Sequence, residues 1–183
     1  MEKQLLNSPA IRNHIKEISR RIAETHPDTE VLVLAGIRKG EKLAERLAEE
    51  IERISGKRPV VGVIDTSLYR DDLGGARLTE HPVLCPTDIP CSVEGRQVIL
   101  IDDVLYTGRT IRAAMDALID LGRPAKIELA VLIDRGSREF PIQPDYAGME
   151  ISIEDNRSIR LELHEDRNQD KAVITSSEQV VNH

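Results

Sequence analysis

The most constraining feature of this sequence is an apolar run that ends in two adjacent aspartates and leads into a helix-like segment. Residues 98–101 are all apolar, Asp102 and Asp103 follow them, and residues 107–110 read Thr-Gly-Arg-Thr. Apolar side chains then recur with helical spacing over residues 110–121. A buried strand that leads into a helix is typical of a parallel sheet, in which ligands bind beyond the carboxyl ends of the strands. We therefore expect a ligand site at this connection.

Other segments repeat the alternation of strand and helix. Largely apolar segments at residues 31–35, 60–64 and 127–133 predict three more strands. Residues 10–22 and 41–54 carry apolar side chains three and four positions apart, which predicts amphipathic helices. The three predicted apolar stripes are Ile11, Ile15, Ile18 and Ile22, then Leu43, Leu47, Ile51 and Ile54, and finally Ile111, Met115, Leu118 and Ile119. This order predicts an α/β fold, an open parallel sheet with helices on both faces.

The length and the irregular segments predict one domain with a long internal flap. The chain has 183 residues, and we expect a single domain over residues 1–174 and a frayed tail over residues 175–183. Residues 67–94 are polar and contain two adjacent glycines and three prolines. A connection of that length is usually functional, so a flap is expected there. Residues 151–174 predict two short, partly exposed strands.

Composition excludes several classes of protein. The net charge of -7 argues against a globally basic nucleic-acid binder, and an aromatic content of 2% argues against a base-stacking platform. No apolar run approaches the length of a membrane span and no signal-peptide segment opens the chain, so a cytoplasmic protein without a membrane partner is expected. Cys85 and Cys91 lack a metal or redox spacing, and the five histidines are scattered.

The side chains of the connection suit a sugar phosphate. A helix start offers unpaired backbone N–H groups and the positive end of the helix dipole, which favour a phosphate monoester. Gly108 lets the backbone approach that phosphate, and Thr107 and Thr110 add hydroxyl donors. Asp102 and Asp103 would repel a phosphate, so we expect them to face the hydroxyls of a ribose. The alternative is that the two aspartates cap the following turn and the Thr-Gly-Arg-Thr stretch is an ordinary helix start.

The stretch at residues 98–110 also resembles a known signature. Its sequence, Val-Ile-Leu-Ile-Asp-Asp-Val-Leu-Tyr-Thr-Gly-Arg-Thr, is similar to the segment with which type I phosphoribosyltransferases bind 5-phosphoribosyl-1-pyrophosphate (PRPP). The Val-Leu-Tyr-Thr-Gly-Arg-Thr part resembles the pyrimidine operon attenuator / uracil phosphoribosyltransferase (PyrR) family. Further similar stretches lie at residues 67–73, 115–118, 121–124 and 134–136 and at Arg138 and Glu139.

The resemblance implies a fold, a reaction and partners. The fold would be that of the type I phosphoribosyltransferases, with residues 1–10 and 151–174 forming a small hood over the base. The reaction would convert uracil and PRPP to UMP and pyrophosphate, with Mg²⁺ carried by PRPP and no direct metal ligand in the protein. Members of the family respond to UMP and bind the leader mRNA of the pyrimidine operon. They usually form homodimers or homotetramers.

Individual roles follow from the same resemblance. PRPP or UMP would contact Asp102, Asp103, Val104, Leu105, Tyr106, Thr107, Gly108, Arg109 and Thr110. Pyrophosphate would contact Arg38, Lys39, Tyr69 and Arg70, and the catalytic groups would be Asp102, Asp103, Arg70 and Arg135. The aspartates would bind the ribose hydroxyls and stabilise the positive charge that develops on the sugar ring. The alternative for the arginines and the lysine is an ordinary solvated surface position.

The resemblance implies an RNA-binding surface on the first helix and after the fourth strand. Its candidates here are Arg12, Lys16, Arg20, Arg21 and Arg138. Glu17, Gln143 and Met149 stand where the family pattern has Arg, Arg and Lys. RNA binding weakens with every cation that no longer contacts a phosphate. The alternative to an RNA-binding surface is an ordinary solvated helix face.

Three further positions depart from the family pattern. The loop at residues 36–40 is one residue shorter, Ser137 replaces a histidine, and residues 151–154 read Ile-Ser-Ile-Glu in place of Ile-Pro-Thr-Ser. The change at Ser152 and Glu154 affects the segment expected over the base. Two alternatives therefore stay open: a non-catalytic UMP-sensing, RNA-binding regulator, and a phosphoribosyltransferase for another base such as hypoxanthine or guanine.

Overall fold

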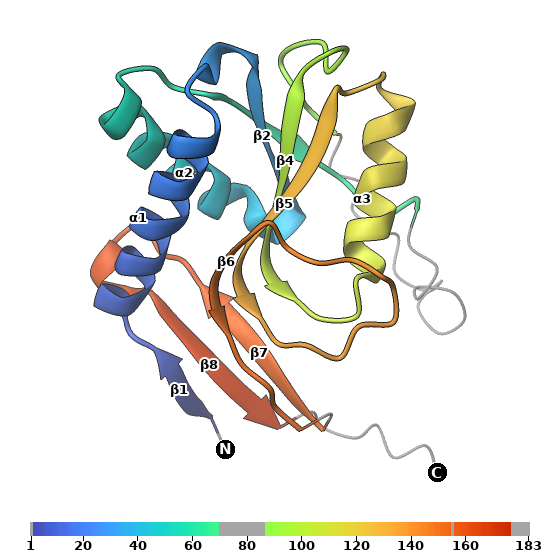
Figure 1. Ribbon diagram of the computed structural model, residues 1–183. Coiled ribbons are helices and arrows are strands. Elements are labelled where there is room, and N and C mark those ends of the chain that lie inside the picture. Colours follow the sequence, from blue (N-terminus) through green and yellow to red (C-terminus); the bar gives the residue numbers. More distant parts are fainter. Residues whose placement is uncertain (1, 70–86, 155, 177–183) are drawn as a thin grey trace.

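A five-stranded parallel sheet forms the centre of the fold in the computed structural model, which describes residues 2–69, 87–154 and 156–176, without the side chain of Lys39. The strands follow the order β3-β2-β4-β5-β6 (Figure 1). They are β2 (Leu32–Ile37), β3 (Val60–Ile64), β4 (Gln97–Leu105), β5 (Lys126–Asp134) and β6 (Tyr146–Glu150). The predicted parallel α/β sheet is thus confirmed. None of the helices in the described ranges is long and apolar enough to cross a membrane.

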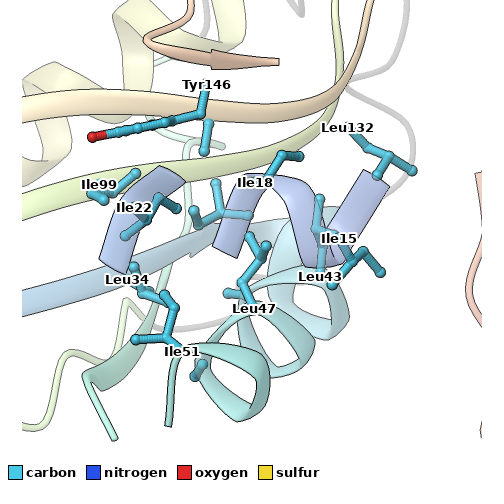
Figure 2. Packing of buried hydrophobic residues seen from close by; sticks show 14 of the residues in the cluster. Ile15, Ile18, Ile22, Leu34, Leu43, Leu47, Ile51, Ile99, Leu132 and Tyr146 are labelled. Carbon is cyan, nitrogen blue, oxygen red and sulfur yellow. The ribbon is translucent and has the colours of Figure 1, made fainter. Parts of the chain in front are cut away.

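Helices cover both faces of this sheet. They are α1 (Ser8–Thr25), α2 (Glu41–Ser55) and α3 (Arg109–Asp120). The helices α1 and α2 share one core cluster with the sheet, and α3 covers the opposite face with a second cluster. Figure 2 shows Ile18 and Ile22 of α1 beside Leu47 of α2 and Ile99 of β4. The burial of long apolar stripes from two helices against one face fixes the helices on the sheet.

The predicted stripes are buried except at Ile54, Ile119 and the partly buried Met115. All four isoleucines of the first stripe are buried, as are Leu43, Leu47 and Ile51. Ile54 and Ile119 were expected in the core, but they are 51% and 58% exposed. Both lie in the last turn of their helices.

A second, smaller sheet is antiparallel and has the order β1-β8-β7. Its strands are β1 (Lys3–Leu6), β7 (Arg157–Glu162) and β8 (Lys171–Ser176). Segments from both ends of the described chain thus lie side by side in this sheet (Figure 1). The strand β7 contacts β4, which places the small sheet against the strand that carries the two aspartates.

Several boundaries differ from the sequence predictions. The strand β4 was expected to end at residue 101, but it continues through both aspartates to Leu105, because its ladder with β5 continues from Asp102↔Val131 to Leu105↔Asp134. The strands β1 and β6 were not predicted, since neither has a run of apolar residues. The strand β8 extends to Ser176, two residues into the predicted tail. Residues 70–86 of the predicted flap lie outside the described residues, and the domain limits stay a prediction.

Candidate functional site

The connection between β4 and α3 borders a cavity of about 350 Å³. Asp102, residues 104–111 and Glu139 line this cavity, which we call the loop cavity. The helix α3 begins at Arg109, and its N-cap residue, Gly108, offers no side chain to the first-turn N–H groups. Thr107 Oγ1 accepts from Arg109 N (3.3 Å). A helix start without an N-cap side chain leaves its further N–H groups and the positive dipole end for an anion.

Gly108 has a backbone conformation that L residues rarely adopt. Its φ is 90°, in the left-handed region. A Cβ at this position would lie 3.3 Å from Ile142 Cδ1 and 3.4 Å from Phe140 Cβ. The tight turn between β4 and α3 therefore favours glycine both for its backbone and for the space around it.

The two aspartates line two different cavities. Asp102 is buried, with 7% of its surface exposed, and borders the loop cavity. Asp103 borders a second cavity of about 760 Å³, which we call the hood cavity. Consecutive residues of a strand point to opposite sides, so adjacent carboxylates reach both spaces. Each also accepts a local backbone bond, from Asp103 N to Asp102 Oδ1 (2.9 Å) and from Val104 N to Asp103 Oδ1 (2.8 Å).

The hood cavity lies between the start of α2 and the small sheet. Besides Asp103, it is lined by Arg38, Glu41, Lys42, Ser158, Ile159, Arg160, Leu161, Glu162, Leu163, His164 and Thr175. Arg38 belongs to the short 3₁₀ turn Arg38–Gly40 that follows β2. The structure thus brings one predicted pyrophosphate residue to the same cavity as one of the aspartates. Arg70 and the side chain of Lys39 lie outside the described residues.

Gly40 allows this turn to approach β4 closely. A Cβ at Gly40 would lie 2.3 Å from Ile101 O and 3.2 Å from Asp102 Cα. Only a residue without a side chain fits such a contact with backbone. The turn that carries Arg38 is therefore seated directly against the strand that carries the aspartates.

Arg135, which follows β5, is a buried residue rather than a surface arginine. It is 4% exposed, and its guanidinium carbon lies 3.7 Å from the centroid of the Tyr106 ring. Arg135 Nη1 donates to Arg157 O (3.0 Å), whereas Nε and Nη2 have no hydrogen-bond partner among the described residues. A buried guanidinium with unused donors beside the loop is a candidate for ligand recognition.

The segment after β5 also holds the loop in place. The backbone N–H groups of Glu139 and Phe140 both donate to Thr107 O, at 2.9 and 3.2 Å. Arg138 donates to Tyr106 O (2.9 Å) and to Asp134 Oδ2 (2.5 Å), and its side chain is 12% exposed. Arg138, a predicted RNA contact, is therefore engaged inside the fold. Glu139 was not predicted to line the site. Its side chain reaches the loop cavity because the segment after β5 is bound to the loop, and the sequence does not reveal that contact.

Tyr69 borders neither of the two cavities. Its hydroxyl donates to Asp120 Oδ2 (2.5 Å) at the end of α3, and this hydrogen bond raises the pKa of Tyr69. Arg112 donates to the backbone oxygen of Tyr69 (2.6 Å). Tyr69, the last described residue before the gap at residues 70–86, is thus attached to α3.

The candidate RNA contacts on α1 differ in how far neighbouring groups already engage them. Arg20 forms ion pairs with Glu17 and Glu24, which raise the pKa of its guanidinium. Arg21 donates to Asp145 O (3.0 Å). Arg12 is bound to the backbone of Arg167 and to the side chain of Asn168, and Lys16 is exposed. Three of these four cations therefore already have protein partners, and within the described residues Arg20 alone of the three is paired with acids.

Comparisons with known proteins agree with this geometry. Residues 1–166 match the family described as "Phosphoribosyl transferase domain". The bifunctional protein PyrR of Halalkalibacterium halodurans is 50% identical over 166 residues, which cover 90% of this chain and 92% of that protein. The PyrR protein of Roseiflexus sp. is 51% identical over 165 residues, covering 90% and 89%.

A solved structure supports the fold. The hypoxanthine phosphoribosyltransferase of Trypanosoma cruzi superposes with a TM-score of 0.69 at 23% identity, covering 96% of this chain and 97% of that chain. The parallel sheet with its flanking helices is thus the one found in that enzyme. The match over most of the sequence and the identity to the PyrR proteins show that this chain belongs to the PyrR family of phosphoribosyltransferases.

Proposed function

We propose that this protein is a cytoplasmic uracil phosphoribosyltransferase that forms UMP and pyrophosphate from uracil and PRPP, and that it also regulates pyrimidine genes in response to UMP. The observation that carries the proposal is the loop cavity, in which an uncapped helix start lies next to a buried aspartate. These groups match the two ends of a ribose 5-phosphate. The phosphate would lie at the start of α3, and the sugar hydroxyls would face Asp102.

The arrangement of the two cavities suggests how transfer occurs. With the phosphate in the loop cavity, the sugar would span β4 at the aspartates, and pyrophosphate would leave toward Arg38 in the hood cavity. Positive charge develops on the sugar ring as its bond to pyrophosphate breaks. Two preorganised carboxylates at this point would stabilise that charge, and one of them would accept the proton that the uracil nitrogen loses.

The carboxylate oxygens at the site fit a magnesium ion that arrives with PRPP. Within the described ranges no group of three acidic, histidine or cysteine side chains is placed to hold a metal. Asp102 and Asp103 provide carboxylate oxygens, which suit a hard cation that keeps most of its ligands from phosphate and water. When bound, Mg²⁺ would neutralise part of the pyrophosphate charge, and the protein would orient the sugar.

Arg135 is the candidate for contact with the base. It borders a small cavity of about 280 Å³ together with Asp134, Gly136, Glu150, Ile151 and Ser152. A guanidinium only donates hydrogen bonds, so it suits the carbonyl oxygens of uracil. Hypoxanthine also carries a carbonyl, and the fold is shared with hypoxanthine phosphoribosyltransferases, which makes a purine the second candidate substrate.

An assay with competing bases tests this proposal. Purified protein is incubated with PRPP, Mg²⁺ and either labelled uracil, hypoxanthine or guanine, and nucleotide and pyrophosphate are measured. We expect UMP and an equal amount of pyrophosphate with uracil only. Product from a purine alone would identify another base specificity, and the lack of pyrophosphate with every base would leave a non-catalytic regulator.

Regulation would occur through the leader mRNA of the pyrimidine operon. The proposed contacts are Arg12, Lys16, Arg20 and Arg21 on α1, and Arg138 is left out because it is bound inside the fold. Binding of a leader transcript, measured with and without UMP at two salt concentrations, should be tighter with UMP and should have a shallow salt dependence, since few phosphates are contacted.

A homodimer or homotetramer is expected, and light scattering would measure the oligomeric state.

A further inference from the structure

The hood cavity has two walls that belong to different parts of the fold. Arg38 and the first turn of α2, with Glu41 and Lys42, line it on the side of the parallel sheet. Residues 158–164, which form most of β7 and the segment after it, line it on the side of the small sheet. The distance from Arg38 to the facing wall therefore depends on how the small sheet is attached to α2.

A buried ion pair joins these two walls. Arg46, one turn after Lys42 in α2, pairs through Nη1 and Nη2 with both carboxylate oxygens of Asp170, which lies just before β8. The side chain of Asp170 is 0% exposed and that of Arg46 is 8% exposed. Either charge alone would be buried and unpaired, so the two side chains stay together and fix the small sheet on α2.

The same two side chains bind His164, the last residue of the small-sheet wall. His164 N donates to Asp170 Oδ1 (2.9 Å), and His164 O accepts from Arg46 Nη2 (2.5 Å). A planar guanidinium can bind the carboxylate and the carbonyl at once, because its donors point in fixed directions. Another link between the walls, from Lys42 Nζ to Leu163 O (3.3 Å), is exposed and therefore weaker.

We infer that Arg46 and Asp170 are positioning residues for pyrophosphate, which fix the wall at His164 relative to Arg38 and so set the width of the hood cavity. Neither is among the residues that line the cavity, so both act through His164 and the start of α2. The inference rests on the proposed function, because it assumes that pyrophosphate leaves toward Arg38. UMP is placed in the loop cavity and beside Arg135, so its binding should not depend on this pair.

Calorimetry of the full chain with Mg²⁺-pyrophosphate and, separately, with UMP tests the inference. Arg46→Lys keeps a cation for Asp170 but loses the planar group that also binds His164 O. Arg58→Lys is the matched control, because Arg58 pairs with Glu45 and Glu52 of the same helix on the exposed surface. None of these three control residues is among those that line the hood cavity.

A second variant removes both charges. Apolar side chains that replace a buried ion pair often leave the fold intact, whereas the loss of one partner leaves an unpaired buried charge. Arg46→Met combined with Asp170→Leu therefore releases His164 without creating such a charge, and Arg58→Met combined with Glu45→Leu is its control. Urea unfolding establishes that each variant is folded before the ligand is added.

We expect the affinity for Mg²⁺-pyrophosphate to fall about tenfold in Arg46→Lys and in the Arg46–Asp170 double variant, because a displaced wall misplaces the groups that contact the ligand. The affinity for UMP should stay within about threefold of the wild type, and the controls should keep both affinities. A pyrophosphate affinity that is unchanged in both Arg46 variants overturns the inference. An equal loss of UMP affinity also overturns it, because the pair would then support the fold as a whole.

The failure of the proposed function gives a different result. If the wild type binds UMP but not Mg²⁺-pyrophosphate, the hood cavity is not a pyrophosphate site and the inference is refuted, while the phosphate site in the loop cavity stands. If the wild type binds neither ligand, both are refuted. If it binds both ligands but forms no UMP from uracil, the catalytic part of the proposed function is refuted. The pyrophosphate affinities then still decide the inference, because calorimetry requires no turnover.

Discussion

Arg109 donates from Nε to Glu139 Oε2 over 2.6 Å, so a residue of the β4–α3 connection is held by an acid that lines the same cavity. The side chains of this pair are 34% and 48% exposed. A carboxylate in the proposed phosphate cavity opposes the charge of the ligand, even though Arg109 compensates it. The loop has a second support that does not depend on this charge, the backbone bonds to Thr107 O.

Glu139→Gln is therefore expected to strengthen the binding of UMP. One unit of negative charge leaves the cavity while the backbone bonds stay, which should raise the affinity about fivefold at low salt. The gain should shrink as salt screens the cavity. Calorimetry with UMP at two salt concentrations measures both effects. Glu24→Gln, which breaks an exposed ion pair with Arg20 on α1, is the control and should leave UMP affinity unchanged. A loss of affinity in Glu139→Gln would show that the acid positions the loop.

Asparagine at Asp102 or Asp103 distinguishes catalysis from capping. An asparagine oxygen can still accept the local backbone bonds that both aspartates accept, so the free energy of unfolding should change little. The negative charge beside the sugar is lost, and we expect kcat/KM for UMP formation to fall at least about 100-fold in either variant. Steady-state assays and urea unfolding measure the two quantities.

Asp28 provides the matched control for these substitutions. Its carboxylate accepts a backbone bond from Glu30 N (3.1 Å), and Asp28 is not among the residues that line the two cavities. Asp28→Asn should leave kcat/KM unchanged. If Asp102→Asn and Asp103→Asn behave in the same way as this control, the two aspartates serve only as caps and the proposed mechanism is wrong.

Gly108→Ala is expected to weaken both the fold and the binding of UMP. The left-handed φ costs an L residue about 1–2 kcal/mol, and the new Cβ would lie within 3.4 Å of the Ile142 and Phe140 side chains. Gly56 at the end of α2 has a φ of 77° and nothing within 4 Å of an added Cβ. Gly56→Ala thus reports the backbone cost alone. Thermal unfolding should show a larger loss for Gly108→Ala, and calorimetry should show weaker UMP binding in that variant only.

Elements with strong apolar patterns were predictable from the sequence, and elements defined by their partners were not. Ile11, Ile15, Ile18 and Ile22 form the buried stripe that their spacing predicts, because a helix on a sheet must bury one side. The strand β6 has the pattern Tyr-Ala-Gly-Met-Glu and exists because β5 offers it a parallel ladder. Such pairing over long distances leaves no mark in a short, mixed sequence.

The same division applies to the candidate site. The connection from Asp102 to Thr110 was predictable, since its residues are contiguous and act through the local geometry of a helix start. Glu139 was not, because its side chain reaches the loop cavity from a segment that lies far along the chain from this connection. Arg138, which the family resemblance assigned to the RNA-binding surface, makes four hydrogen bonds to backbone and carboxylate oxygens within the fold, and these partners could not be inferred from the sequence.

Ionisation of Tyr146 is expected to lower the free energy of unfolding at alkaline pH. Its ring is buried at the start of β6, and its hydroxyl lies 3.2 Å from His26 Nε2. Burial raises the pKa of Tyr146 above its ordinary value of 10.0. The folded state therefore retains the phenolic proton more strongly than the unfolded state. The stability that this provides is complete below about pH 10 and is lost as the pH rises through the higher pKa of the folded state.

Tyr146→Phe isolates this effect. Between about pH 7 and pH 9 the wild type should be more stable than the variant by about 1 kcal/mol, the value of a typical buried hydrogen bond. Above about pH 10 the difference should shrink, because only the wild type loses stability by ionisation at this position. Urea unfolding at several pH values measures both curves. Curves that stay parallel up to about pH 11 would show that the Tyr146 hydroxyl ionises as readily in the folded protein as in the unfolded chain, which its burial between α1 and β6 argues against.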